Sequence, residues 1–598
     1  MRAIQFFSKK MKQLFFGLLP MVFIAVAFEN CSGSFTSLSA DKSGNFSFSS
    51  ILPSMKGPGA SPLRRLSNLE YRNSFVDAIT QQFSRQNALV KATAILNSEN
   101  MNGKFSMLPQ DIPSVRLGSD QVAAFLSPSR FETYVEIADG VAQMIVQDAT
   151  TLKAFAGDCA VSDTSISNTS CLDSFIKNFG ALTFRRPVSS TEMAELKTGI
   201  ANWHDLIGRL LVHPRFLSHF EREGRLIGSN GVYQLNPYEL EAKLCSVFWK
   251  SIPDIQGLAI AASGALLTEA GVRTEVKRLL ASPKAQDVLW IFYQQWFATS
   301  RVPKNFDINP TLNLVFRADL TFRYEGLGPQ AVQDGKDFLN YITWTSNGKL
   351  EDIFRSPLLL ASTPDMGKVY GVTPRSSPSD PPIVDSTGHF KGILTRSIIS
   401  MQKPSVSNEV NHILRGVFVA TNLLGIELGS PANFGEQNQA AGQVPVGAST
   451  RTEVTVKTSA TNCMGCHSTI NPSGFALAHY DSLGRYNDVE LRQRDGPNGS
   501  VNTIATNTID ASTSLNINGK VYTINGADQL VDALFSSGKI YEAFTKYYFR
   551  FSFGRTENAI NDKPLMDAMK LSLQNQSIKA ALESMAVHPD FSRVKAAD

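Results

Sequence analysis

The sequence predicts a mainly α-helical protein of several domains, with a small β-hairpin near the C-terminus. Three observations lead to this prediction. The chain has 598 residues, more than one hydrophobic core usually organises. Apolar residues recur at helical spacing through most of it, and helix-capping patterns precede several of these runs. The composition, 43% hydrophobic and 18% charged, is that of an ordinary globular protein.

The first 31 residues have the pattern of an export signal. Four basic residues precede the apolar run 14–28, which is too short to span a bilayer comfortably as a permanent helix. Cys31 follows, where a lipoprotein signal would be cleaved and the new N-terminal cysteine acylated. We therefore expect an extracytoplasmic protein, in the periplasm or outer cell envelope, anchored to the membrane by a lipid on Cys31. Cleavage without lipid attachment remains the alternative.

Two capping patterns predict where helices begin. Ser67 and Glu70 form a capping box ahead of an apolar stripe. Asn236, Pro237 and Glu239 repeat the order of cap, first-turn proline and glutamate. Helices should therefore start just after residues 67 and 236.

Two of the six cysteines flank a polar loop. Between Cys159 and Cys171, residues 161–170 are mostly Ser, Thr, Asp and Asn, so hydrophobic burial can do little to order them. In an oxidising compartment a disulfide would close this loop, with a stabilisation of roughly 3 kcal/mol from restricting the unfolded chain. We predict this disulfide; two unpaired thiols are the alternative. Cys245 lies in an apolar stretch and is interpreted as a buried small side chain.

Turn signals are clearest towards the C-terminus. Asn518-Gly519 separates the apolar stretches 515–517 and 521–524, which predicts a β-hairpin. Helical spacing resumes over 540–553 and 564–585.

A Val-His-Pro sequence occurs twice, at residues 212–214 and 587–589. In each copy the proline should end one helix and start another. His213 and His588 are therefore interpreted as structural residues.

The motif with the strongest chemical implication is Cys463-Met464-Gly465-Cys466-His467. Residues three and four apart share a helix face, so both thiols could bond the vinyl groups of one haem while His467 approaches its iron. This spacing is the attachment signature of c-type haem, and histidine is a common axial ligand. The sequence predicts one haem c per chain, bound by Cys463, Cys466 and His467, with His467 as the iron ligand.

Three other interpretations of the motif stay open. A thioredoxin-like dithiol would need βαβ surroundings, which the sequence does not show. A structural zinc site would need a fourth ligand, and there is no second close cysteine pair to supply it. The third interpretation is a motif that has lost its haem.

The segment 463–485, CMGCHSTINPSGFALAHYDSLGR, resembles the haem-motif segment of the large cytochrome c-like proteins first recognised in planctomycetes. Those proteins join five uncharacterised domains, and stretches of this chain resemble all five in order. They are PLRRLSNLEYRN at 62–73; CLDSFIKNFGALTFRRPVSSTE at 171–192; RFLSHFE with LNPYELEAKLCSVFW and FYQQWF at 215–221, 235–249 and 292–297; LRGVFVATNLLG at 414–425 with the haem motif; and IDASTSLNINGKVYTINGADQL with YYFRFSFGR at 509–530 and 547–555.

The resemblance, together with local composition, implies a division of the chain. We expect a signal at 1–31, a flexible tether rich in Ser, Gly and Pro at 32–61, an N-terminal helical domain at 62–150, a second helical domain with Cys159 and Cys171 at 151–225, a third helical domain at 226–372, the cytochrome c-like haem-motif domain at 373–500, and a C-terminal domain of hairpin and helices at 501–598.

The iron would need partners beyond its proximal ligand. We expect His467 to donate the hydrogen of its other ring nitrogen to a carbonyl of an Asn471-Pro472 turn. The sixth iron ligand is left open. A six-coordinate haem transfers electrons, whereas an open position can bind a small molecule. Candidates are His479, Met566, Met569, Met401 and His412.

These observations favour an exported c-type cytochrome-like protein that transfers electrons outside the cytoplasm to a redox partner protein of unknown identity. The net charge of +4 gives no case for a nucleic-acid partner, which would need a clustered basic stripe. Two alternatives are an envelope-associated helical scaffold with a structural or vestigial haem, and the redox subunit of an oxidoreductase of unknown substrate. The chain contains no nucleophile elbow, P-loop or dinucleotide fingerprint.

Overall fold

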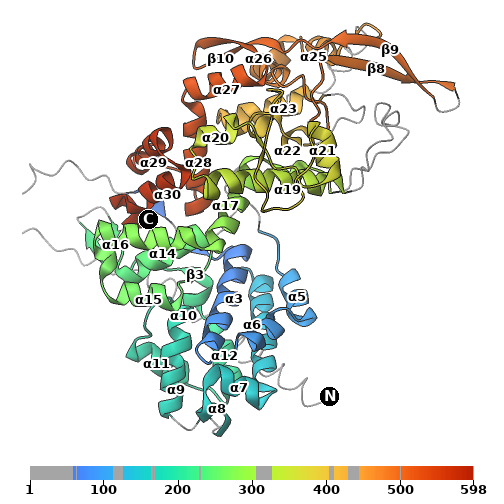
Figure 1. Cartoon of the computed structure of the whole chain (residues 1–598). Helices are drawn as coiled ribbons and strands as arrows, with labels where there is room; N and C mark the ends of the chain where they lie inside the picture. Colours follow the sequence, from blue (N-terminus) through green and yellow to red (C-terminus); the bar gives the residue numbers. More distant parts are fainter. Residues whose placement is uncertain are drawn as a thin grey trace, which may run out of the picture. The chain divides into compact units, whose positions relative to one another are not determined.

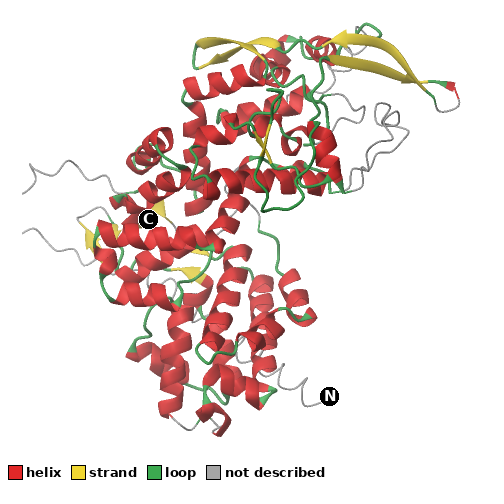
Figure 2. Cartoon of the chain, viewed as in Figure 1, coloured by secondary structure: helices red, strands yellow, loops and turns green. Residues whose placement is uncertain are grey.

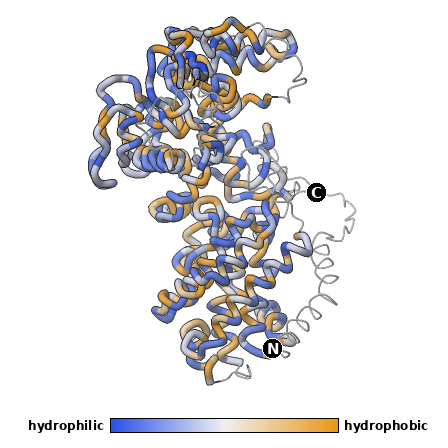
Figure 3. Tube along the Cα trace, turned by 90° about the vertical axis from the view of Figure 1, so that its right-hand side faces the viewer, coloured by the Kyte–Doolittle hydropathy of each residue, from blue (hydrophilic) through white to orange (hydrophobic). Residues whose placement is uncertain are grey.

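Helices make up most of the structure, a computed structural model, and the strands form only small sheets (Figure 1 and Figure 2). This confirms the predicted mainly α fold. Within single helices, hydrophobic and hydrophilic residues alternate (Figure 3), as expected for helices that bury one face. The residues described are 58–61, 64–111, 126–162, 166, 169–227, 231–304, 326–402, 410–428, 444–497 and 500–596.

The predicted export signal with Cys31, and the tether up to residue 57, lie outside the described residues. Within the part of the chain that the structure describes, no helix is long and apolar enough to cross a membrane.

The helices before residue 218 share an aromatic core. The Tyr71 ring lies 4.3 Å from the Tyr134 ring, and the Phe83 ring lies 5.0 Å from the Phe155 ring. The predicted segments 62–150 and 151–225 therefore pack against each other. The helices are α3 (Asn68–Ser84), α4 (Leu89–Leu96), α5 (Glu99–Ser106), α6 (Pro128–Val146), α7 (Ala149–Ala156), α8 (Asp158–Ser162), α9 (Thr169–Phe175), the π-helix η1 (Ile176–Gly180), α10 (Ala181–Phe184), α11 (Ser190–Lys197), α12 (Trp203–Leu211) and α13 (Pro214–Leu217).

Both predicted capping boxes are present. The Glu70 amide donates to the Ser67 hydroxyl, and the Ser67 amide donates to the Glu70 carboxylate, at 3.2 and 3.0 Å. Asn236 and Glu239 make the same reciprocal pair at the start of α14 (Pro237–Trp249). Local sequence therefore determines these two helix starts.

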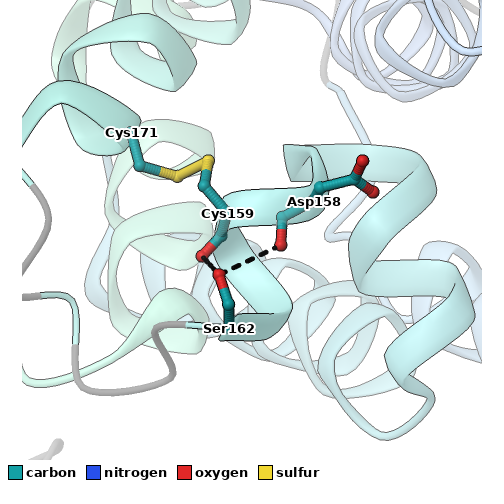
Figure 4. The surroundings of a disulfide bond; sticks show 4 residues. All are labelled: Asp158, Cys159, Ser162 and Cys171. Carbon is teal, nitrogen blue, oxygen red and sulfur yellow. Dashed lines mark hydrogen bonds between the residues drawn. A yellow bond between two sulfur atoms is a disulfide. The ribbon is translucent and has the colours of Figure 1, made fainter.

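The predicted disulfide joins Cys159 of α8 to Cys171 of α9, with the Cα atoms 6.0 Å apart (Figure 4). Both residues sit on short helices, and the Ser162 hydroxyl donates back to the carbonyls of Asp158 and Cys159 at 3.4 and 3.2 Å. The prediction is confirmed. The bond ties together two helices too short to be stable alone.

Buried apolar residues from Leu235 to Val594 form one continuous core. Trp296 and Asn422 tie its middle together: the indole donates to the Asn422 carbonyl at 2.8 Å, and the Asn422 amide group donates to the Trp296 carbonyl at 2.6 Å. Besides α14, its middle section contains α15 (Ile255–Ala262), η2 (Ala265–Leu267), α16 (Glu269–Ala281), α17 (Pro283–Trp296), η3 (Thr299–Arg301), α19 (Leu327–Asn340), the π-helix η4 (Tyr341–Thr345), α20 (Leu350–Arg355), α21 (Pro364–Tyr370), η5 (Ile393–Thr395) and α22 (Ser397–Ser400).

The C-terminal helices complete this core. The Phe544 ring packs edge-on against Phe292 and Trp296 of α17, with centroids 5.2 and 5.0 Å apart. The helices from residue 412 onward are α23 (His412–Phe418), the π-helix η6 (Val419–Leu423), α25 (Thr450–Lys457), α26 (Thr461–Phe475), α27 (Ala527–Ser536), α28 (Lys539–Phe553), α29 (Lys563–Asn575), α30 (Ile578–Val587) and η8 (Pro589–Ser592), and all but α25 and α26 contribute residues to this core.

A buried ion pair connects α19 to the residue that precedes α22. The Arg396 guanidinium donates to Asp334 at 3.1 Å and also to the Leu358 carbonyl, and it lies 3.8 Å from the centre of the Phe338 ring. The Tyr370 hydroxyl donates to the same Asp334 oxygen at 2.7 Å. Both charged side chains are almost completely buried.

Two β-hairpins lie in the C-terminal part (Figure 2). The predicted one is β10 (Ser512–Ile517) with β11 (Lys520–Asn525), and Asn518 and Gly519 both have positive φ, as its two-residue turn requires. The other, β8 (Val489–Asp495) with β9 (Val501–Thr508), was not predicted. Its alternating Val-Glu-Leu-Arg start was the available signal.

Short strands also bring distant parts of the chain together. A four-stranded sheet has the order β1 (Ala60–Ser61), β12 (Arg593–Ala596), β5 (Val232–Gln234), β4 (Arg225–Ile227), so residues near both ends of the described chain pair directly. Strands this short carry no periodic signal in sequence. Two further pairs are β2 (Arg64–Arg65) with β3 (Ser218–His219), and β6 (Leu358–Leu359) with β7 (Ile383–Val384).

The two Val-His-Pro segments adopt the same local structure. His213 and His588 are both N-caps, and each Nδ1 accepts from the amide two residues ahead, at 3.2 Å. Each is followed by a strand that pairs with the N-terminal segment, β3 with β2 and β12 with β1. The interpretation of both histidines as structural is confirmed.

A buried carboxyl pair lies between α14 and α16, with Glu241 on the first helix and Glu275 on the second. Glu241 is fully buried beside Glu275, and burial, then the Glu275 charge, raises the pKa of Glu241 to about 8. Cys245, also fully buried as predicted, donates its S–H to Glu241 at 3.3 Å, and Arg278 binds both Glu275 and Asp254 while lying 3.8 Å from Glu241. Glu241 therefore keeps its proton to a higher pH than an ordinary glutamate does.

This protonated carboxyl makes stability depend on pH. The pKa of Glu241 is raised in the folded protein. Its contribution to the free energy of unfolding is therefore complete below pH 4.5, the ordinary pKa of a glutamate, and is lost as pH rises through about 8. Glu241→Gln should keep the neutral form, so its advantage over the wild type should grow to a few kcal/mol across this window. Urea unfolding at several pH values measures it, and parallel curves for the two proteins would contradict the prediction.

Candidate functional site

The Cys463–His467 motif lies in the first two turns of α26. Cys463 and Cys466 are free thiols, and both they and His467 are partly exposed. Their spacing of three and four residues puts the three side chains on one face of the helix. α26 directly follows another helix, α25, so the motif does not stand in the strand-to-helix setting of a thioredoxin-like dithiol.

The second ring nitrogen of His467 is bound by a neighbouring side chain. Nδ1 lies 2.8 Å from Oδ1 of Asn471, one helical turn ahead. Asn471 in turn donates from Nδ2 to the Thr458 hydroxyl at 2.8 Å. We expected a carbonyl of this residue pair, and the partner is the side-chain carbonyl of Asn471.

The expected Asn471-Pro472 turn is wrong. α26 continues through Pro472 to Phe475. Proline removes one intrahelical hydrogen bond and usually ends a helix, but here tertiary contacts hold the C-terminal half of α26 in place. The nearest of these are with α23.

α23 and α26 cross at very short distance because each has a glycine at the crossing. A Cβ atom at Gly416 would lie 1.9 Å from the Ile470 carbonyl oxygen, and one at Gly474 would lie 2.0 Å from the His412 carbonyl oxygen. Each helix therefore presents bare backbone to a carbonyl of the other. A side chain at either position would push the helices apart.

Arg415 of α23 fixes the chain that leaves α26. Its buried guanidinium donates to the carbonyls of Leu477, Tyr480 and Asp481 at 3.1, 2.5 and 2.6 Å. Burial lowers the pKa of Arg415 to about 10. Because a buried carbonyl without a donor costs free energy, this arginine helps to satisfy the carbonyls of the segment that follows α26.

The segment after these carbonyls is a tight turn built on Asp481. Its carboxylate accepts from the amides of Leu483 and Arg485 at 2.9 and 3.0 Å and from the Arg485 side chain at 2.7 Å. Gly484 has φ +90°, and a Cβ there would lie 3.0 Å from Ser397. The turn thus closes against α22.

The histidines considered as sixth ligands have structural partners. His412 is buried, with Nδ1 3.4 Å from the Gly474 carbonyl and Nε2 3.0 Å from the Thr450 hydroxyl, and burial lowers its pKa to about 3. His479 binds the Asn487 carbonyl through Nδ1 at 2.8 Å and stacks on Tyr486.

The methionine candidates pack in or against the core. Met401 and Met569 are fully buried in it, and Met566 packs against it. Among the residues that the structure describes, no group of three or more His, Cys, Asp or Glu side chains could hold a metal ion.

Sequence reasoning missed Thr458, Arg415 and the paired glycines. None belongs to a motif with known chemistry, and their partners lie up to 66 residues away. A glycine inside a helical pattern was the available signal, because such a residue costs helix stability unless packing needs it.

Two family models match the chain. Residues 235–372 match PSD4, a protein of unknown function (DUF1592), and residues 391–490 match PSCyt3, a protein of unknown function (DUF1588); together they cover less than half of the chain. No curated protein and no solved structure gives a significant match. Over these two regions the chain is similar to planctomycete cytochrome c-like families, and the Cys463–His467 motif lies within the second region.

Proposed function

We propose that the chain is an exported c-type cytochrome-like protein that binds one haem covalently and transfers electrons outside the cytoplasm. The observation that carries the proposal is the arrangement on α26. Two free, partly exposed thiols share a face with a histidine whose Nδ1 is already bound, which leaves Nε2 for iron. The similarity of residues 391–490 to a cytochrome c-like family supports it.

These residues fit a c-type haem. Cys463 and Cys466 would hold the haem by thioether bonds, and His467 would bind its iron. A bound haem would supply one-electron chemistry. The protein's own contribution is to orient His467 through Asn471 and to keep α26 rigid through the Gly416–Gly474 crossing.

The haem proposal predicts a covalent label. Denatured wild-type protein, matured in a host with c-type haem assembly, should keep haem peroxidase staining on a gel and give a pyridine haemochrome spectrum. The Cys463→Ala/Cys466→Ala variant should lose the stain because the thioether bonds cannot form, whereas Cys245→Ala, a free cysteine elsewhere, should retain it. An unstained wild type would contradict the proposal and favour the helical scaffold.

Export and anchoring form the second part of the proposal. The Cys159–Cys171 disulfide suits an oxidising compartment, and the signal-like N-terminus ends at Cys31. The redox partner would be a protein met in the envelope.

A lipid on Cys31 should be detectable directly. Metabolic labelling with a palmitate analogue should mark the wild type, and Cys31→Ser should release the protein into the soluble fraction because the anchor is lost. Freely soluble, unlabelled wild-type protein would contradict the anchor, while leaving export to be judged from the fraction in which the protein is found.

A further inference from the structure

The side chains of Thr458, Asn471 and His467 form a continuous hydrogen-bonded network where α25 meets α26. The Thr458 hydroxyl, almost fully buried, donates to the Val454 carbonyl at 2.8 Å. It also accepts from Nδ2 of Asn471 at 2.8 Å, and Oδ1 of Asn471 lies 2.8 Å from Nδ1 of His467. Thr458 and Asn471 are both buried, so water does not easily replace either partner.

The hydrogen atoms of this network have only one consistent arrangement. A carbonyl can only accept, so the single hydroxyl hydrogen of Thr458 points to Val454. The hydroxyl must then accept from Asn471, which turns the amide oxygen of Asn471 towards His467. That oxygen also only accepts, so Nδ1 of His467 carries a hydrogen and Nε2 of the neutral ring has a free lone pair.

We infer that Asn471, held in orientation by Thr458, is a positioning residue that sets the tautomer of His467 and presents Nε2 as the iron ligand. This inference deepens the proposed function and rests on it for the identity of the metal. An acceptor on Nδ1 raises the basicity of the ligating nitrogen, so Asn471 also strengthens His467 as a donor to iron. The network links the end of α25 to His467, the proposed haem ligand.

The tautomer can be read without haem. In the full-length apo protein labelled with ¹⁵N-histidine, well above the ordinary histidine pKa of about 6.5, the ring signals of His467 should show hydrogen on Nδ1. His467→Gln identifies these signals. Thr458→Val should shift the ring towards the other tautomer, because the Asn471 amide is then free to flip. Thr455→Val is the matched control: its exposed hydroxyl bonds only within α25, to Arg451, and it should leave the spectrum unchanged.

The midpoint potential gives a second reading in the haem-loaded protein. Asn471→Leu removes the acceptor without changing charge, so His467 becomes a weaker donor and the potential should rise. Thr458→Val should raise it less, and Thr455→Val should not move it. A role limited to packing would change the unfolding midpoint but not the potential.

Hydrogen on Nε2 in the wild type, or an unchanged tautomer in Thr458→Val, would overturn the inference. An unchanged potential in Asn471→Leu would do the same. Failure of the haem proposal looks different: the wild type would carry no covalent stain, whatever tautomer the apo protein shows.

Discussion

Gly474→Ala should unfold the protein at clearly lower denaturant concentration than the wild type. The added methyl would lie 2.0 Å from the His412 carbonyl oxygen, a backbone atom that cannot rotate away. Helices α23 and α26 must then separate, and overpacking of this kind costs about 1–3 kcal/mol or more. Incorporation of the proposed haem should fall as well, because the C-terminal half of α26 loses its support. Urea unfolding followed by circular dichroism measures the loss.

Gly465→Ala is the matched control on the same helix. A Cβ there has open space, with nothing within 4 Å. Alanine is also the better helix former, so stability should stay unchanged or rise by roughly 0.5–1 kcal/mol. Equal effects of the two substitutions would show that the crossing distance is not what Gly474 provides.

Asp334→Ala should cost about 3–5 kcal/mol, the usual effect of removing one partner from a buried ion pair. It would leave the Arg396 charge almost completely buried and the Tyr370 hydroxyl without its acceptor. The pair joins the region 235–372 to the region 391–490, so its loss should loosen both. Thermal unfolding and protease sensitivity around residues 372–391 would report it.

A double-mutant cycle separates the charge from the packing. Adding Arg396→Met removes the unpaired charge and should recover part of the lost stability. Asp567→Ala, which breaks an exposed pair with Lys563 one turn away, serves as the comparison and should cost less than about 0.5 kcal/mol. A similar small cost for Asp334→Ala would mean that the buried pair does not hold the two regions together.

Local signals predicted a good part of this protein. The helix starts at Ser67 and Asn236, the Asn518-Gly519 hairpin and the two structural histidines all depend on hydrogen bonds within a few residues, so the sequence nearby is sufficient. The Cys159–Cys171 bond was predictable because the loop between them is short and polar. The Cys463–His467 motif could also be found from local sequence, since its spacing alone puts its side chains on one helix face.

The setting of that motif was decided by contacts between distant residues. Pro472 predicts a turn, but the close crossing of Gly474 with α23 and the hydrogen bonds from Arg415 to carbonyls after α26 keep the segment helical through Phe475. Sequence patterns report local preference, whereas these contacts depend on where α23 lies in space, 62 residues earlier in the chain. Sequence thus determined the residues that could bind a haem and the helices that carry them. Tertiary packing decided how His467 is held, because the Thr458 hydroxyl reaches Asn471 only after α25 and α26 have folded against each other.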